Sequence, residues 1–456
     1  MELVVLNGSP KGPESVTMQY VNLWKKKAPA CSFTVLNVAQ RILRYERGEG
    51  FEELVPLIER AQGVIWAFPL YYCLVCSQYK RFIECLFERG LTEAFRGKYA
   101  ASLSTSIHFY DHTAHNYIRA ISEDMGMKFY ASFSADMDDI LKEKKREMFL
   151  KWGEDFIAAI ERKAPTGRWF APVRYEGKPY LMESPPVKID AQGKKILVLA
   201  DVTAEESNVA KMVGRFIDAF TSPVTYVRLQ DVPMSGGCLG CMECAFDNKC
   251  VYKDGYRDFF EQNVRTADIV VFAGAIKDRY LSSRFKMFLD RSFFNGHTPV
   301  YRGKQIAYLI EGPLSQNHNL LEIIQGQTEI SGGHLAGVVT DEAGEGKVID
   351  ALLDDLARRL VTYAHWGYQQ PLTFLGVGGH KIFRDEIWSR LRFPFQADYK
   401  FYEEHDLFDF PQKDTRYLEF GEKMTALIQD PNVREQVRKM LKSEMLRSYK
   451  KVVETK

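Results

Sequence analysis

Short, almost wholly apolar segments recur in the same order in two halves of the chain, and this repeat constrains the fold more than any other feature. Residues 3–6 (LVVL) open the first half, and residues 195–200 (KILVLA) open the second. A further apolar run, at 63–71 and again at 268–274, follows a helical pattern in each half. Apolar strands that alternate with helices are typical of parallel sheets covered on both faces. The sequence therefore predicts an α/β protein with two doubly wound parallel sheets in tandem.

The predicted organisation has four parts, because 456 residues exceed what a single hydrophobic core holds. We expect two α/β domains, an extended linker between them that is rich in proline, glycine and polar residues, and a helical C-terminal extension. In chain order these parts are residues 1–163, 164–194, 195–376 and 377–456. Within the extension, helices are expected at 383–391 and 414–452.

The composition excludes several kinds of partner. The 61 Lys and Arg residues balance 60 Asp and Glu residues, so no basic face for nucleic acid is indicated. No apolar run approaches the length of a membrane-spanning helix, and the N-terminal segment reads at once as a strand, without the basic start of a signal peptide. We therefore expect a cytoplasmic protein. In a reducing compartment, its eight cysteines favour metal or redox chemistry over structural disulfides.

The turn after the first strand is rich in groups that bind a phosphate. It carries Ser9, Lys11, Ser15 and Thr17 around the start of a helical pattern. Free backbone N–H groups and the positive end of a helix attract an anion, and hydroxyl groups add donors. The turn fits neither a Walker loop nor a dinucleotide fingerprint, so we expect a terminal monophosphate such as that of FMN. The alternative is an ordinary Asn-Gly-Ser-Pro turn with no ligand.

The corresponding loop of the second half is acidic. Asp201, Glu205 and Glu206 lie where a phosphate would bind, and Coulomb repulsion makes this a poor anion site. We therefore expect FMN in the first domain only.

Four cysteines in the second half share one short segment with the spacing C-x2-C-x2-C-x5-C: Cys238, Cys241, Cys244 and Cys250. Four thiolates on a compact loop can reach the four iron corners of a [4Fe-4S] cluster. Zinc usually takes two C-x2-C pairs separated by a longer insert, which this segment lacks. The alternative is a cysteine-rich loop without metal, whose thiols are free or transiently paired.

These motifs together resemble those of the flavodoxin-like NAD(P)H-dependent FMN reductases and the related iron–sulfur flavoproteins, over roughly residues 1–160 and 194–375. The turn after the first strand resembles the family's FMN-phosphate loop, and residues 68–72 and 104–106 resemble its loops around the flavin ring. The resemblance implies cofactor contacts from Ser9, Lys11, Ser15, Thr17, Pro69, Leu70, Tyr71, Tyr72, Thr105 and Ser106. It also implies a [4Fe-4S] cluster on Cys238, Cys241, Cys244 and Cys250.

One departure from the family is informative. In the family, one domain carries both the flavin loop and the cysteines, and two copies pair. In this chain the two features are split between the halves. We therefore expect an internal pseudo-dimer, by itself or within a homo-oligomer, in which the flavin and the cluster lie within electron-transfer reach.

His108 and Tyr110 are the candidate catalytic residues, because they follow the third predicted flavin loop. Histidine titrates near neutral pH and can pass a proton to a reduced flavin or a substrate. The alternative is that this segment only caps the next helix, with Asp111 as the N-cap. Cys73 and Cys76 form a further C-x2-C pair, which we expect to be buried thiols rather than a redox pair.

These expectations combine into an FMN-dependent oxidoreductase. It would take electrons from NAD(P)H or ferredoxin and pass them to a quinone, a flavin or another small acceptor, since FMN exchanges both hydrides and single electrons. Two alternatives stay open from sequence: a cluster-free NAD(P)H-dependent FMN or quinone reductase with structural cysteines, and a non-catalytic electron carrier of the flavodoxin type.

Overall fold

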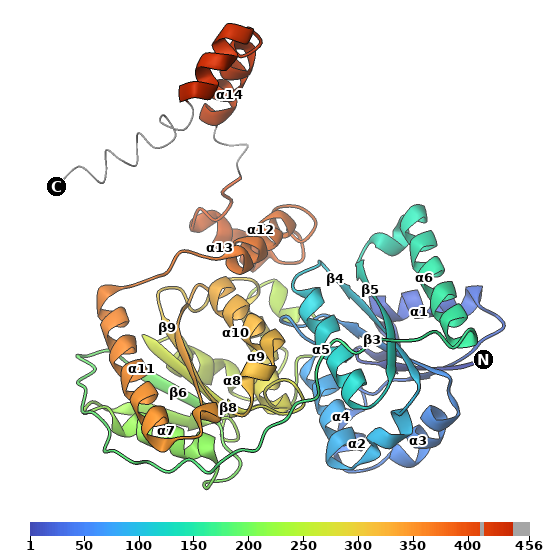
Figure 1. The fold of residues 1–456 in the computed structure, drawn as a ribbon, viewed down its shortest axis with the longest axis horizontal. Helices are drawn as coiled ribbons and strands as arrows, with labels where there is room; N and C mark the ends of the chain where they lie inside the picture. Colours follow the sequence, from blue (N-terminus) through green and yellow to red (C-terminus); the bar gives the residue numbers. More distant parts are fainter. Residues whose placement is uncertain (411–414, 441–456) are drawn as a thin grey trace. The chain divides into compact units, whose positions relative to one another are not determined.

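Two five-stranded parallel sheets organise the chain, as the apolar strand pattern predicted (Figure 1). The computed structural model describes residues 1–410 and 415–440. The chain divides into two compact units, Met1–Phe401 and Tyr402–Lys456, and the first unit contains both sheets.

The first sheet is formed by β1 (Glu2–Asn7), β2 (Ser32–Leu36), β3 (Gly63–Pro69), β4 (Tyr99–Ser106) and β5 (Lys128–Asp136). Its strand order is β2-β1-β3-β4-β5, and every neighbouring pair is parallel. This is the flavodoxin-like doubly wound order, in which ligands bind beyond the carboxyl ends of the strands.

The second sheet repeats this arrangement. Its strands are β6 (Ile196–Asp201), β7 (Val224–Arg228), β8 (Ile269–Ala275), β9 (Gln305–Glu311) and β10 (His334–Thr340). Their order, β7-β6-β8-β9-β10, matches the first sheet strand for strand. The registers also match: Gly63 pairs with Tyr99, and Ile269 pairs with Gln305, so equivalent residues from β3 and β8 onwards differ by 206 in number (63 to 269, 99 to 305). The predicted fold class is therefore confirmed.

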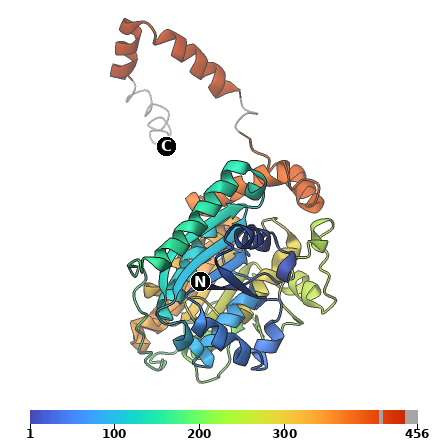
Figure 2. The same ribbon diagram turned by 90° about the vertical axis from the view of Figure 1, so that its right-hand side faces the viewer.

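Helices cover both faces of each sheet. In the first half, α1 (Val16–Lys27) and α6 (Glu143–Glu161) pack on one face around buried Trp24, and Figure 2 shows α6 lying across that face. The other helices of this half are α2 (Ile42–Glu46), α3 (Phe51–Arg60), α4 (Ser77–Glu88) and α5 (Asp111–Asp124). The second half contains α7 (Asn208–Asp218), α8 (Tyr256–Phe259), α9 (Ser283–Arg291), α10 (His318–Ile330) and α11 (Gly346–Trp366).

The halves meet through α4 against α9 and α5 against α10. Two buried ion pairs occupy equivalent positions there, Lys80–Glu84 and Lys286–Asp290. Across the interface, the backbone N–H of Ser77 donates to Asp290 (2.7 Å), and that of Ser283 donates to Glu84 (2.6 Å). These contacts are reciprocal, since Ser77 and Glu84 correspond to Ser283 and Asp290. The two halves therefore face each other about an approximate two-fold axis.

The remaining segments are the linker between the halves and the helices that follow α11. Residues 162–195, which join α6 to β6, contain no helix and only the isolated bridge of Ile189 to Phe220 in the described structure. After α11 come α12 (Phe374–Trp388), α13 (Gln396–Glu404) and α14 (Arg416–Leu427). None of the helices among the described residues is both long and apolar enough to cross a bilayer.

The first helix predicted in the extension, at 383–391, starts earlier than expected. In the structure α12 already begins at Phe374, because Thr373 caps it and Glu329 accepts hydrogen bonds from the backbone N–H groups of Thr373 and Gly376 (2.9 Å each). This anchor overrides the glycines at 376, 378 and 379, which disfavour a helix by themselves. In the second predicted helix, 414–452, Asp414 and residues 441–452 lie outside the described residues.

Candidate functional site

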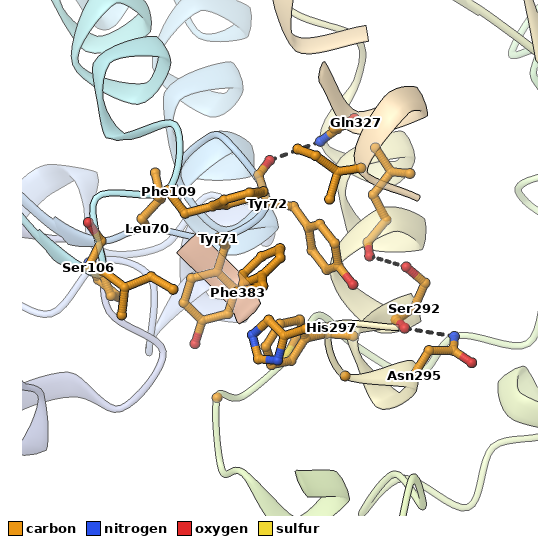
Figure 3. A pocket seen from close by; sticks show the side chains of 18 of the residues that line it. Leu70, Tyr71, Tyr72, Ser106, Phe109, Ser292, Asn295, His297, Gln327 and Phe383 are labelled. Atoms are coloured by element: carbon orange, nitrogen blue, oxygen red, sulfur yellow. Dashed lines mark hydrogen bonds between the residues drawn. The ribbon is translucent and has the colours of Figure 1, made fainter. Parts of the chain in front are cut away.

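A cavity of about 320 Å³ opens at the carboxyl end of the first sheet and continues into the second half (Figure 3). Nine of the ten predicted cofactor contacts line it: Ser9, Lys11, Ser15, Pro69, Leu70, Tyr71, Tyr72, Thr105 and Ser106. The tenth, Thr17, is fully buried, and its hydroxyl lies 2.6 Å from that of Thr105. Thr17 therefore supports the wall of the cavity from behind.

Residues 7–17, here called the phosphate turn, hold their polar groups by local hydrogen bonds. Ser15 is the N-cap of α1 and accepts from the N–H of Met18 (3.3 Å), while the hydroxyl of Ser9 accepts from the N–H of Lys11 (3.2 Å). Gly12 adopts φ +60, a left-handed conformation that glycine adopts without strain. The polar end of the cavity thus combines hydroxyl groups, one lysine and the positive end of α1, which suits an anion.

Residues 69–73, the flavin loop, adopt an uncommon backbone conformation that the second half holds in place. Tyr72 and Cys73 have φ of 40 and 66, in the left-handed region. The ammonium of Lys286 donates to the carbonyl of Tyr71 (2.8 Å), and the amide of Gln327 donates to that of Tyr72 (2.9 Å; Figure 3). Since strained residues persist only where the surroundings fix them, the second half helps to shape the first half's binding loop.

An aromatic wall, formed by Phe293, His297, Phe383 and Phe395, lines the cavity beside the flavin loop. The ring of His297 lies 4.5 Å from Phe383 and 4.7 Å from Phe395, and Phe293 packs edge-on against Tyr72 (5.4 Å). His297 is fixed by Asp398, whose carboxylate lies 2.7 Å from Nδ1. The sequence analysis missed this wall, because no spacing motif joins its members; the aromatic run at 393–395 was the one available signal.

The two candidate catalytic residues do not line the cavity, whereas Phe109 between them does. The carboxylate of Asp111 lies 2.9 Å from Nδ1 of His108 and raises the pKa of this half-exposed histidine. Tyr110 is buried against Gly326, and burial raises its pKa. Nearby His115 is buried between the hydroxyls of Ser102 and Ser104, and burial lowers its pKa to about 4, so it is a neutral core residue.

Residues 238–250, the cysteine loop, lie against the same cavity. Cys238 and Gly240 contribute to its lining, and the amide of Gln78 donates to the carbonyl of Cys238 (3.0 Å). A Cβ at Gly240 would clash with the Tyr71 hydroxyl and would also contact Lys11. The flavin loop and the cysteine loop, far apart in sequence, therefore touch.

The four thiols have the chemistry of iron ligands but are not gathered around one point. Burial, followed by the proximity of Cys250 and Cys241, raises the pKa of Cys244 to about 12. Within the described ranges, all eight cysteines are free, and no three Cys, His, Asp or Glu side chains converge as metal ligands. Cys73 and Cys76 are buried thiols, and burial raises the pKa of Cys73 well above its usual range.

The second half fills its own equivalent of the phosphate turn. Glu311, which corresponds to Thr105, accepts from the N–H of Val209 at the start of α7 (2.9 Å). A carboxylate of the chain thus lies where an anion would bind. Glu205 and Glu206, which predicted repulsion, are exposed to solvent, so Glu311 is the group that occupies the helix terminus.

Comparisons with known proteins find several solved structures that match about a third of the chain. The solved structures that match include an NADH:FMN oxidoreductase (EMOB) in its apo form, with 20% identity over 35% of this chain and 89% of that chain and a TM-score of 0.30. Another is FerB, a flavoenzyme NAD(P)H:(acceptor) oxidoreductase from Paracoccus denitrificans, with 17% identity, 35% and 97% coverage and a TM-score of 0.29. A third is general stress protein 14 from Treponema denticola in complex with FMN, with 14% identity, 35% and 98% coverage and a TM-score of 0.27.

No curated protein matches the chain. Residues 1–136, however, match the family model described as NADPH-dependent FMN reductase. This range contains the whole phosphate turn, the flavin loop and the strand end at Thr105 and Ser106. The match supports the predicted enzyme class, an NAD(P)H-dependent flavin oxidoreductase, through residues 1–136, which are similar to the NADPH-dependent FMN reductases.

Proposed function

We propose that the chain binds one FMN at the phosphate turn and reduces a small acceptor, such as a quinone or a free flavin, with electrons from NAD(P)H. One observation carries this proposal: the range that matches the FMN reductase family is also the range whose hydroxyl-rich turn opens at the start of α1 into the cavity. A hydroxyl-rich helix terminus suits a terminal phosphate.

Each part of the cavity has a proposed task. Ser9, Lys11 and Ser15 would hold the phosphate, and the flavin loop with Thr105 and Ser106 would hold the ring. When bound, FMN accepts a hydride and releases electrons singly or in pairs. The chain's own residues bind and orient it, and the aromatic wall excludes water from the ring.

His108 remains the proposed proton donor at the rim of this site. Its backbone N–H donates to the hydroxyl of Ser106 (2.9 Å), which lines the cavity, and Asp111 favours the protonated imidazole. The burial of Tyr110 against Gly326 offers no support for a similar role of this tyrosine.

A finer proposal concerns the cysteine loop. We propose that Cys238, Cys241, Cys244 and Cys250 hold a [4Fe-4S] cluster next to the flavin, with ferredoxin as an alternative electron donor. The contact of Cys238 and Gly240 with the flavin cavity supports this proposal. The lack of converging thiols among the described residues favours the alternative, a cluster-free reductase.

The experiments separate these proposals. Flavin released from anaerobically purified protein should amount to about one FMN per chain, and NADH or NADPH should bleach its absorbance in a stopped-flow trace. No retained flavin at saturating FMN would refute the main proposal. Turnover with a small quinone and no protein partner excludes the electron-carrier alternative. Iron and acid-labile sulfide should be present in the wild type and lost in Cys241→Ala, with FMN retained; their absence from the wild type leaves the cluster-free reductase.

A further inference from the structure

The cavity does not end at the flavin loop but extends into the core of the second half. There it is lined by an apolar chamber formed by Phe272, Ser292, Tyr301, Ile306, Tyr308 and Thr328. Phe272 packs against Tyr308 (5.2 Å between ring centroids) and Tyr301 (6.1 Å), and all three rings are buried. The chamber therefore lies beside β8 and β9 of the second sheet, away from the phosphate turn.

The walls of the chamber present mostly carbon. The hydroxyl of Ser292 donates to the carbonyl of Leu289 (2.7 Å; Figure 3), and that of Thr328 donates to the carbonyl of Ile324 (2.8 Å). These hydroxyls are thus satisfied by their own helices. A polar ligand group placed here would lose its hydrogen bonds to water, which disfavours the flavin phosphate and the nicotinamide ribose. An apolar group loses nothing and is favoured.

The first half provides an internal comparison, because equivalent residues from β3 and β8 onwards differ by 206 in number. Trp66 stands at the position of Phe272, is fully buried, and stacks on Phe95 (6.1 Å). Leu86 stands at the position of Ser292 and is also fully buried. Neither residue lines the cavity. The first half fills this region with side chains, whereas the second half keeps it open.

We propose that the apolar chamber binds the hydrocarbon side arm of a quinone acceptor, whose ring lies at the mouth of the chamber beside Tyr72 and Phe293. This inference rests on the proposed function and names its substrate class. In the overall reaction NAD(P)H gives a hydride and water gives a proton, so NAD(P)H becomes NAD(P)⁺ and the quinone becomes a hydroquinone. The second half then provides the substrate-binding chamber for the flavin site of the first half.

Binding measurements on the oxidised FMN-loaded protein, without NAD(P)H, test this directly. Isothermal titration calorimetry compares 2-methyl-1,4-naphthoquinone with its 3-butyl derivative. The wild type should bind the butyl compound at least about tenfold more tightly, because each buried methylene contributes roughly a factor of four and burial of two already gives this ratio. In steady-state assays with NAD(P)H, the KM values should show the same ratio.

Two changes at one position provide the matched comparison. Ser292→Leu introduces the residue that the first half carries there and narrows the chamber, so the affinity ratio should fall towards one. Ser292→Ala keeps the space and should keep the ratio. Thr328→Leu fills the chamber from α10 and serves as the second filling variant if Ser292→Leu does not fold.

Three results would overturn the inference. Equal affinities for the two quinones in the wild type would show that no side arm is bound. An unchanged ratio in the filling variants would place the side arm elsewhere. Loss of FMN from Ser292→Leu, with equal weakening of both quinones, would mean that the chamber holds the flavin ring. Failure of the proposed function would give a different result, because the wild type would then retain no FMN.

Discussion

Replacing Lys286 by methionine should weaken FMN binding although this residue belongs to the second half. Lys286 is fully buried, forms an ion pair with Asp290 and donates to the carbonyl of Tyr71 (2.8 Å) in the flavin loop. Methionine keeps most of the length and removes the charge. Asp290 would keep one hydrogen bond across the interface, from the N–H of Ser77 (2.7 Å).

The magnitude follows from these contacts. Removing one partner of a buried ion pair costs about 3–5 kcal/mol of the free energy of unfolding. Burial already raises the pKa of Asp290, and Lys286 offsets this effect only in part. In the variant this carboxyl can therefore take up a proton, which keeps the loss in the free energy of unfolding near the lower end of that range. The lost hydrogen bond to Tyr71 is worth roughly 1 kcal/mol, which corresponds to about a fivefold increase in the Kd for FMN.

Lys80→Met is the matched control, because Lys80 occupies the equivalent position in α4. It pairs with Glu84 and donates to the carbonyl of Lys277 (3.0 Å), in a loop without a predicted flavin. Glu84 also accepts from Arg81 (3.1 Å) and Ser283 (2.6 Å), so the stability loss should be somewhat smaller than for Lys286→Met. FMN affinity should not change.

Urea titration followed by tryptophan fluorescence measures the free energy of unfolding, and quenching of FMN fluorescence measures its Kd. The reasoning predicts that both variants are destabilised and only Lys286→Met binds FMN more weakly. If Lys80→Met weakened FMN binding as much, the effect would be a general consequence of instability. If neither variant weakened FMN binding, the flavin loop would not depend on the second half.

Three further predictions use the same assays. Ser15→Ala should lower the free energy of unfolding by about 1 kcal/mol, because α1 loses its cap, and should also weaken FMN binding. Ser207→Ala removes the equivalent cap of α7 and should affect stability alone. Equal FMN affinities of the two variants would exclude Ser15 from the phosphate site. Glu311→Gln should destabilise the start of α7 by roughly 0.5 kcal/mol, and an unchanged free energy of unfolding would contradict the assignment of Glu311 to this helix terminus. Asp111 raises the pKa of His108 in the folded state, so the stability that this ion pair contributes is fully present below the unfolded pKa and is lost as the pH rises through the folded value. The difference in Tm between the wild type and His108→Gln should therefore shrink as the pH rises above about 6.5, and a constant difference would argue against this ion pair.

Much of the fold could be predicted from local sequence. Runs such as residues 3–6 and 195–200 are too short for helices and apolar on both faces, which fits buried parallel strands. The phosphate turn could also be found, because a glycine, hydroxyl groups and the start of a helix lie within one short segment. Local periodicity and turn chemistry are properties of neighbouring residues, and a single chain displays them directly.

The direction of side chains in the loops could not be predicted. His108 and Tyr110 adopt φ of 61 and 56, and it is Phe109 that lines the cavity. Residues in the left-handed region interrupt the regular direction of side chains that a strand or a helix would impose. The sequence therefore located this loop but could not show which of its side chains line the cavity.

The sequence by itself determined two doubly wound sheets and a phosphate turn in the first of them. Only the tertiary structure decided that Lys286 and Gln327 hold the flavin loop, that Glu311 fills the second helix terminus, and that the second half keeps an apolar chamber open. Each of these contacts depends on how separate elements pack, and most join residues more than 200 positions apart (Tyr71 to Lys286, Tyr72 to Gln327). Such pairing leaves no periodic trace in the chain, because it arises when whole helices and sheets pack together.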